Sequence, residues 1–70
     1  MTLFAEEIQP GWRVIDSTGE ELGIVISVDH ETISIQRLGL LGGVWHAPRD
    51  AVREVETGRV ELSLRKDELS

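Results

Sequence analysis

The sequence predicts an all-β fold: a small barrel of about six short strands, with a short helical turn before the last strands. Apolar and polar residues alternate over short runs, as in strands with one buried face. These runs recur roughly every eight to twelve residues, and turn-forming residues separate them. No stretch shows a helical repeat of useful length. Together these features favour a curled sheet over a helical bundle.

The first strand is predicted at Trp12–Ile15, with Trp12 packing as a lid on the core. Asp16-Ser17-Thr18-Gly19 has the composition of a tight turn, because Asp and Ser side chains bond nearby backbone groups. Gly19 accepts a positive φ without steric cost. We therefore expect a hairpin at this point.

The second strand is predicted at Glu21–Val28. Strict alternation places Ile24, Ile26 and Val28 on one face of this strand. Gly23 lies inside the run, and glycine within a strand indicates a bulge or a close approach of another backbone.

A third strand is predicted at Thr32–Gln36, with Ile33 and Ile35 facing inward. A short fourth strand follows at Val44–Ala47. Pro48 should end it, because proline lacks the N–H that a ladder needs.

The remaining chain is predicted as a single helical or 3₁₀ turn at Arg49–Ala51, an extended run holding Val52 and Val55, a turn at 56–59, and a final strand at 59–65. The whole chain, 1–70, is expected to be one domain with its core at about 8–64. Near the N-terminus, Ile8 can dock on the body. Residues 66–70 are expected to be a charged, frayed tail.

The amino-acid composition disfavours several classes of function. The chain has 70 residues, 13 acidic and seven basic side chains and a net charge of −6. This charge disfavours direct nucleic-acid binding and anionic membrane surfaces. No apolar run approaches the ~20 residues of a membrane span, so no membrane insertion is expected. The chain has no cysteine, which fits a reducing, cytoplasmic location.

The sequence offers no catalytic motif, so we expect no enzyme activity, cofactor or metal. No serine or cysteine lies in a nucleophile motif, and no glycine pattern matches a phosphate loop. His30 lies between Asp29 and Glu31 and is predicted to be a solvated turn residue. The paired acids are likewise predicted to be solvated charges: Glu6-Glu7, Glu20-Glu21 and Asp67-Glu68.

The stretch from Arg37 to Gly43 is both leucine-rich and glycine-rich. Two interpretations stay open: its leucines cover one end of the barrel, or they form an exposed surface for self-association. Trp45 has the same two alternatives, core or interface. Arg49 and Arg53 form the one candidate basic patch, and pairing with Asp50 or Glu54 is the expected fate. The residues of the candidate interaction surface are Leu38, Leu40, Leu41, Val44, Trp45, His46 and Arg49.

Several motifs resemble those of one known superfamily. They are Gly11-Trp12-Arg13-Val14, the turn Asp16-Ser17-Thr18-Gly19, Leu22-Gly23-Ile24-Val25, Ala47-Pro48, and Ala51-Val52 with Val55. With these motifs the chain resembles, over roughly residues 8–64, the PRC-barrel-like superfamily. Its members include the cytoplasmic domain of the photosynthetic reaction centre H subunit and the C-terminal domain of ribosome maturation factor M.

The resemblance implies a β-barrel that serves in protein interaction or assembly, without catalytic residues to carry over. Our leading hypothesis is a self-associating module, a homodimer, that contacts itself or another protein through the candidate surface. The alternative is an accessory factor that binds a ribonucleoprotein through protein contacts. The alternative rests on analogy of fold.

Overall fold

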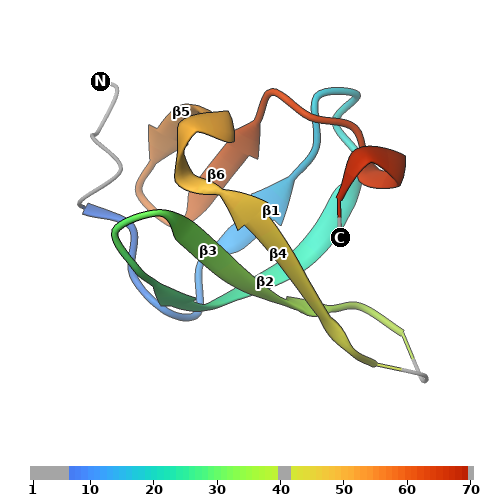
Figure 1. The fold of residues 1–70 in the computed structure, drawn as a ribbon, viewed down its shortest axis with the longest axis horizontal. Helices are drawn as coiled ribbons and strands as arrows, with labels where there is room; N and C mark the ends of the chain where they lie inside the picture. The colour runs from blue at the N-terminus through green and yellow to red at the C-terminus, as the bar shows by residue number, and fades with distance from the viewer. Residues whose placement is uncertain (1–6, 40–41, 70) are drawn as a thin grey trace.

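The computed structural model describes residues 7–39 and 42–69, and its described part is built from short strands and 3₁₀ turns (Figure 1). The elements are β1 (Arg13–Ile15), β2 (Glu21–Val28), β3 (Thr32–Arg37), β4 (Val44–Pro48), η2 (Arg49–Ala51), β5 (Val52–Glu56), β6 (Arg59–Leu62) and η3 (Lys66–Glu68). The predicted all-β class is confirmed. The 3₁₀ turn predicted after Pro48 is confirmed as η2.

The strands form a six-stranded sheet in the order β4-β3-β2-β1-β6-β5. Neighbours are antiparallel except β1 and β6, which run parallel. The sheet curls around the interior, but pairing among the described residues does not close it, because β4 and β5 end the order without pairing to each other. The structure is therefore an open, curled sheet, and the closed barrel is not formed by its ladders.

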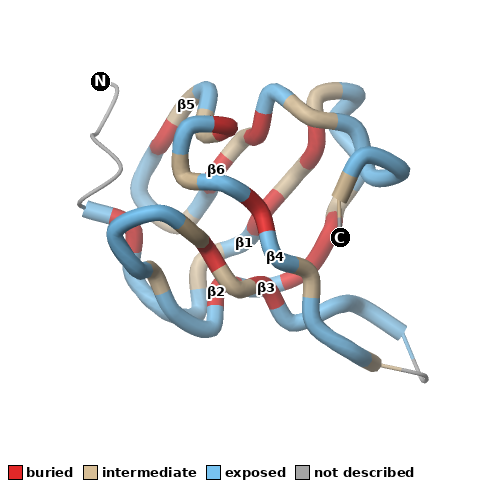
Figure 2. The backbone as a smooth tube through the Cα atoms, viewed as in Figure 1, coloured by how far each residue is buried: buried red, intermediate tan, exposed pale blue. Residues whose placement is uncertain are grey.

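The core lies inside the curl, where the buried segments of Figure 2 face one another. Ile33 and Ile35 are fully buried, as their alternation predicts. Trp12 packs against this core, which confirms its predicted role as a lid. The buried cluster consists of Ile8, Val14, Leu22, Val25, Ile33, Ile35, Ala47, Val55, Val60 and Leu62.

A β-bulge in β2 changes which of its residues face the core. Val25 pairs with Ile35 and Val28 pairs with Ile33, so Ile26 is an extra residue between them. Because one residue has been inserted, Val25 and Val28 face the same side although they are three apart. Both then pack on the inward isoleucines of β3.

The predicted grouping of Ile24, Ile26 and Val28 on one face is therefore wrong. Ile24 and Ile26 are each 42% exposed, whereas Val28 packs against the core. Strict alternation fails here because the bulge reverses the faces of the residues that follow it.

A second bulge does the same in β5. Val52 pairs with Leu62 and Val55 with Val60, which leaves Arg53 as the extra residue. Val52 and Val55 consequently both turn toward the core despite their spacing of three. A helix-like spacing of apolar residues is accommodated here in an extended strand.

Gly23 shows both features that glycine in a strand predicts. A Cβ at Gly23 would overlap the backbone carbonyl of Gln36 on β3. On the other side, Val14 pairs with Gly23 and Ile15 pairs with Glu21, so Leu22 is bulged. Only glycine permits β2 and β3 to approach this closely.

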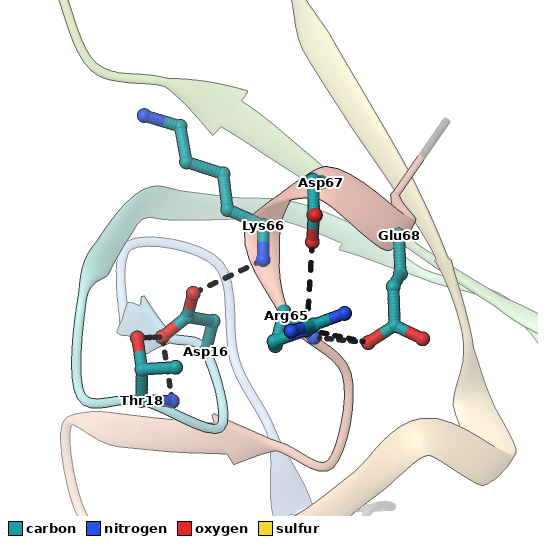
Figure 3. A network of polar contacts seen from close by, with 6 residues as sticks. All are labelled: Asp16, Thr18, Arg65, Lys66, Asp67 and Glu68. Atoms are coloured by element: carbon teal, nitrogen blue, oxygen red, sulfur yellow. Dashed lines mark hydrogen bonds and ion pairs between the residues drawn. The ribbon is translucent and has the colours of Figure 1, made fainter.

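The prediction of a frayed C-terminal tail is wrong for residues 66–69. The turn η3 lies against the first hairpin, and the backbone N–H of Lys66 donates to the buried carboxylate of Asp16 at 3.0 Å (Figure 3). Leu69 packs against the core. The hydrogen bond from Lys66 holds one end of the segment and the burial of Leu69 holds the other. The charged sequence of the segment predicts neither contact.

Candidate protein-interaction surface

One face of the β2–β3–β4 meander points away from the core and carries no carboxylate, lysine or arginine. Ile24 pairs with Gln36, and Gln36 pairs with Val44, which makes one row across the three strands. A second row is made in the same way by two serines and a histidine. We call this the outer face; its residues are Ile24, Ile26, Ser27, Thr32, Ser34, Gln36, Val44, His46 and Pro48.

The outer face and the adjacent end of β3 hold the large apolar side chains that the described residues leave exposed. Ile24, Ile26 and Val44 are each 42% exposed, and Leu38 is 52% exposed. Scattered apolar side chains are ordinary on a protein surface, but a gathered set marks a contact site. Two of these four lie on β2, one lies on β4 and one lies in the loop that follows β3.

Charge is concentrated elsewhere, above all on β5 and β6. Arg53 Nη1 lies 3.5 Å from Glu61 Oε2, and Arg59 Nη2 lies 3.4 Å from Glu56 Oε1. Arg53 thus pairs across the ladder with Glu61, and no ion pair with the predicted Glu54 is seen among the described residues. Glu54 lies instead 4.0 Å from Arg59. Arg53 is therefore paired with a carboxylate, as expected, although its partner is Glu61.

Trp45 lies on the inner side of β4 and is half-buried against the core. The guanidinium carbon of Arg37 stands 4.2 Å from the centroid of its ring. This is a cation–π contact, and it follows from the hairpin register, because Ile35 pairs with Trp45 and Arg37 is its diagonal neighbour. Core packing of Trp45 is therefore present, and its role in an interface remains a prediction.

The structure places the other predicted surface residues as follows. Val44 and His46 are exposed on the outer face, and Leu38 is exposed in the loop. Arg49 is half-buried and lines a hollow of about 380 Å³ beside Ile8. Leu40 and Leu41 lie outside the described residues. The sequence prediction missed Ile24 and Ile26, and an outward isoleucine pair in an apolar strand gives no signal unless the bulge is known.

The buried carboxylate of Asp16 organises the polar contacts at the opposite end (Figure 3). Its Oδ1 accepts from the Thr18 backbone at 2.9 Å, the Thr18 hydroxyl at 2.7 Å and the Glu20 backbone at 2.9 Å. Burial raises the pKa of Asp16, but the hydrogen bonds from Thr18, Glu20 and Lys66 outweigh it and lower the pKa to about 2. The role of this group is structural, since all its bonds join parts of the fold.

The two histidines border the same hollow. His30 is exposed, as predicted, and it lines a hollow of about 550 Å³ together with His46, Glu31 and Asp50. Within residues 7–39 and 42–69, no three His, Cys, Asp or Glu side chains are grouped so that they could hold a metal ion. In the same residues, no helix is long and apolar enough to cross a membrane.

Comparison with known proteins places the chain in a family. No curated protein and no solved structure matches it. The family described as "Uncharacterized protein conserved in bacteria" (DUF2171) matches residues 8–70, which is nearly the whole chain and includes both the outer face and the Asp16 cluster. The chain belongs to the DUF2171 family.

Proposed function

We propose that this domain is a non-enzymatic protein-interaction module of the cytoplasm that self-associates through its outer face and the β3–β4 hairpin. One observation carries the proposal: the outer face lacks charge in a chain whose net charge is −6. Protein interfaces have an apolar centre depleted of charge and a polar rim. The outer face has this composition, and charged side chains such as Arg13 and Glu21 flank it, 3.6 Å apart.

A protein partner fits this surface better than nucleic acid or lipid does. Phosphate-rich partners require clustered Lys and Arg, and the outer face has none. A second copy is the simplest partner, because two uncharged faces can meet without bringing acidic groups together. Salt-resistant co-purification with ribosomal subunits would instead favour protein contacts within a ribonucleoprotein.

We also propose that the fold is of the PRC-barrel type, in an open form in which β4 and β5 do not pair with each other. It is supported by the motifs of the first hairpin and by the three-residue turn η2, which joins the two edge strands β4 and β5. A crystal structure that superposes all six strands on PRC barrels in the same order would support it. A different strand order in those barrels would contradict it.

Light scattering coupled to gel filtration over a concentration series tests self-association. We expect a mass above the monomer at high micromolar concentration. Val44→Glu should return the chain to a monomer, because it places a charge both in the apolar row and on the β4 strand of the hairpin. Thr57→Glu is the matched control, since Thr57 is exposed in the β5–β6 turn, away from the outer face. A wild-type chain that stays monomeric at high micromolar concentration would refute self-association.

A further inference from the structure

The two edges of the sheet differ in how well they are protected against another strand. Edge strand β5, Val52-Arg53-Glu54-Val55-Glu56, carries three charges and a bulge at Arg53. Edge strand β4, Val44-Trp45-His46-Ala47-Pro48, carries no Lys, Arg or carboxylate, and its ladder to β3 has no register shift. Charges and bulges are the usual means of blocking edge pairing, so only β5 is blocked in this way.

The hydrogen-bond phase of the β3–β4 ladder fixes which groups of β4 point to the free edge. Arg37 N donates to Gly43 O at 3.0 Å, and Arg49 N donates to Glu31 O at 2.8 Å. Because bonded and non-bonded pairs alternate in antiparallel ladders, Trp45 bonds β3, whereas Val44 and His46 direct their N–H and C=O groups outward. The backbone nitrogen of Pro48 also points to the free edge. The N–H that proline lacks is therefore not one that β4 needs in order to pair with β3.

We propose that β4 pairs antiparallel with β4 of a second copy, about a two-fold axis at Trp45. The proposal rests on the proposed function, because it names the partner and the geometry of the same surface. In this register Val44 exchanges two hydrogen bonds with the partner's His46, and His46 does the same with the partner's Val44. The edge is thus complementary to itself, as a two-fold interface requires.

Pro48 and Gly42 exclude the neighbouring registers. An axis at His46 would set Val44 opposite the partner's Pro48, which has no N–H to donate. An axis at Val44 would set His46 opposite the partner's Gly42, whose N–H already donates to its own Gly39 carbonyl at 3.3 Å. Of the three registers, the one centred on Trp45 is the one in which both the N–H and the C=O of Val44 and of His46 gain a partner.

Charge favours this pairing by a second copy. The pairing would set the two outer faces side by side on one continuous sheet, so the contact is made by the β4 ladder and the side chains along it. Pairing through β5 would instead bring Glu54 and Glu56 toward their copies.

Single cysteines test the register, because the chain has no cysteine of its own. Across a non-hydrogen-bonded pair the Cα atoms lie about 4.5 Å apart, within disulfide range. Oxidation should therefore cross-link Trp45→Cys efficiently, and Val44→Cys and His46→Cys poorly. Efficient cross-linking of His46→Cys or Val44→Cys instead would overturn the register.

A proline tests the hydrogen bonds and does not depend on the folding of a Trp45 variant. Val44→Pro removes an outward N–H without breaking the β3 ladder, and it removes two interface bonds per dimer. We expect the dimer dissociation constant, measured by sedimentation equilibrium, to rise about tenfold or more. Val44→Ala keeps the N–H and should retain most of the affinity.

The outcomes separate this inference from the proposed function. A dimer that is unaffected by Val44→Pro, and in which Trp45→Cys does not cross-link, would overturn edge pairing and leave self-association standing. A monomeric wild-type chain would overturn both. Dimerisation with cross-linking confined to position 45 supports both.

Discussion

The carboxylate Oδ2 of Asp16 lies 3.0 Å from the backbone nitrogen of Lys66, and their hydrogen bond joins the first hairpin turn to the C-terminal turn across 50 residues. The other oxygen, Oδ1, holds the hairpin turn itself. One buried side chain thus stabilises a local turn and a long-range contact together. The charged segment 65–69 owes its place to this carboxylate as well as to the burial of Leu69.

Asp16 predicts that stability depends on pH. Its pKa is lowered from 3.8 to about 2 in the folded state, so its contribution is fully present above pH 3.8 and is lost as the pH falls toward 2. The free energy of unfolding should decrease by about 2 kcal/mol from this group over that range. Urea denaturation at pH 5, 4, 3 and 2 measures it.

Two variants isolate the contribution of Asp16. Asp16→Asn should be less stable at pH 5 and should lose this part of the acid dependence, because its amide does not titrate. Asp67→Asn removes an exposed carboxylate near the same turn and should keep the wild-type curve. An Asp16→Asn curve parallel to the wild type between pH 4 and 2 would contradict the assignment.

Gly23→Ala should destabilise the fold strongly. The new Cβ would overlap the carbonyl of Gln36, a backbone atom that cannot rotate away, so β2 and β3 would have to separate. Gly19→Ala is the control: Gly19 has φ +88° but open space around it, and strain alone should cost about 1 kcal/mol. Thermal unfolding of both compares them, and equal losses would show that the close approach is not tight.

The bulge at Ile26 predicts opposite results for two residues that strict alternation would treat alike. Val28→Thr should lower the free energy of unfolding by about 1–2 kcal/mol, because it turns a hydroxyl toward the core. Ile26→Thr should change it by about 0.5 kcal/mol or less, because Ile26 faces outward. Threonine keeps the β-branched shape in both. Chemical denaturation that ranked them the other way would place Ile26 inside.

Much of the fold was predictable from local patterns. The strands β2 and β3, the turn at Asp16–Gly19 and the stop at Pro48 follow from alternation, turn chemistry and the missing proline N–H. Alternation failed within β2 because a bulge is set by a partner strand and leaves no mark in its own sequence. Strict alternation therefore groups Val28 with Ile24 and Ile26, from which the bulge separates it.

Part of the candidate surface was predictable for the same reason. Val44 and Leu38 belong to an apolar stretch with too many glycines for a helix, and both are exposed. Ile24 joins them only because two ladders align it with Val44 through Gln36. A surface that spans three strands depends on register, and register is a property of pairs of strands.

The sequence by itself determined the class of fold, the positions of the turns and the inward side of β3, because these depend on residues close together in the chain. The tertiary structure alone decided the sheet order, the bulges and the docking of η3 on Asp16. It also decided that β4 lies at an edge with an uncharged face beside it. These features depend on contacts between segments that are distant in the chain. Local sequence preferences do not distinguish the alternative arrangements, whereas one buried carboxylate or one inserted residue does.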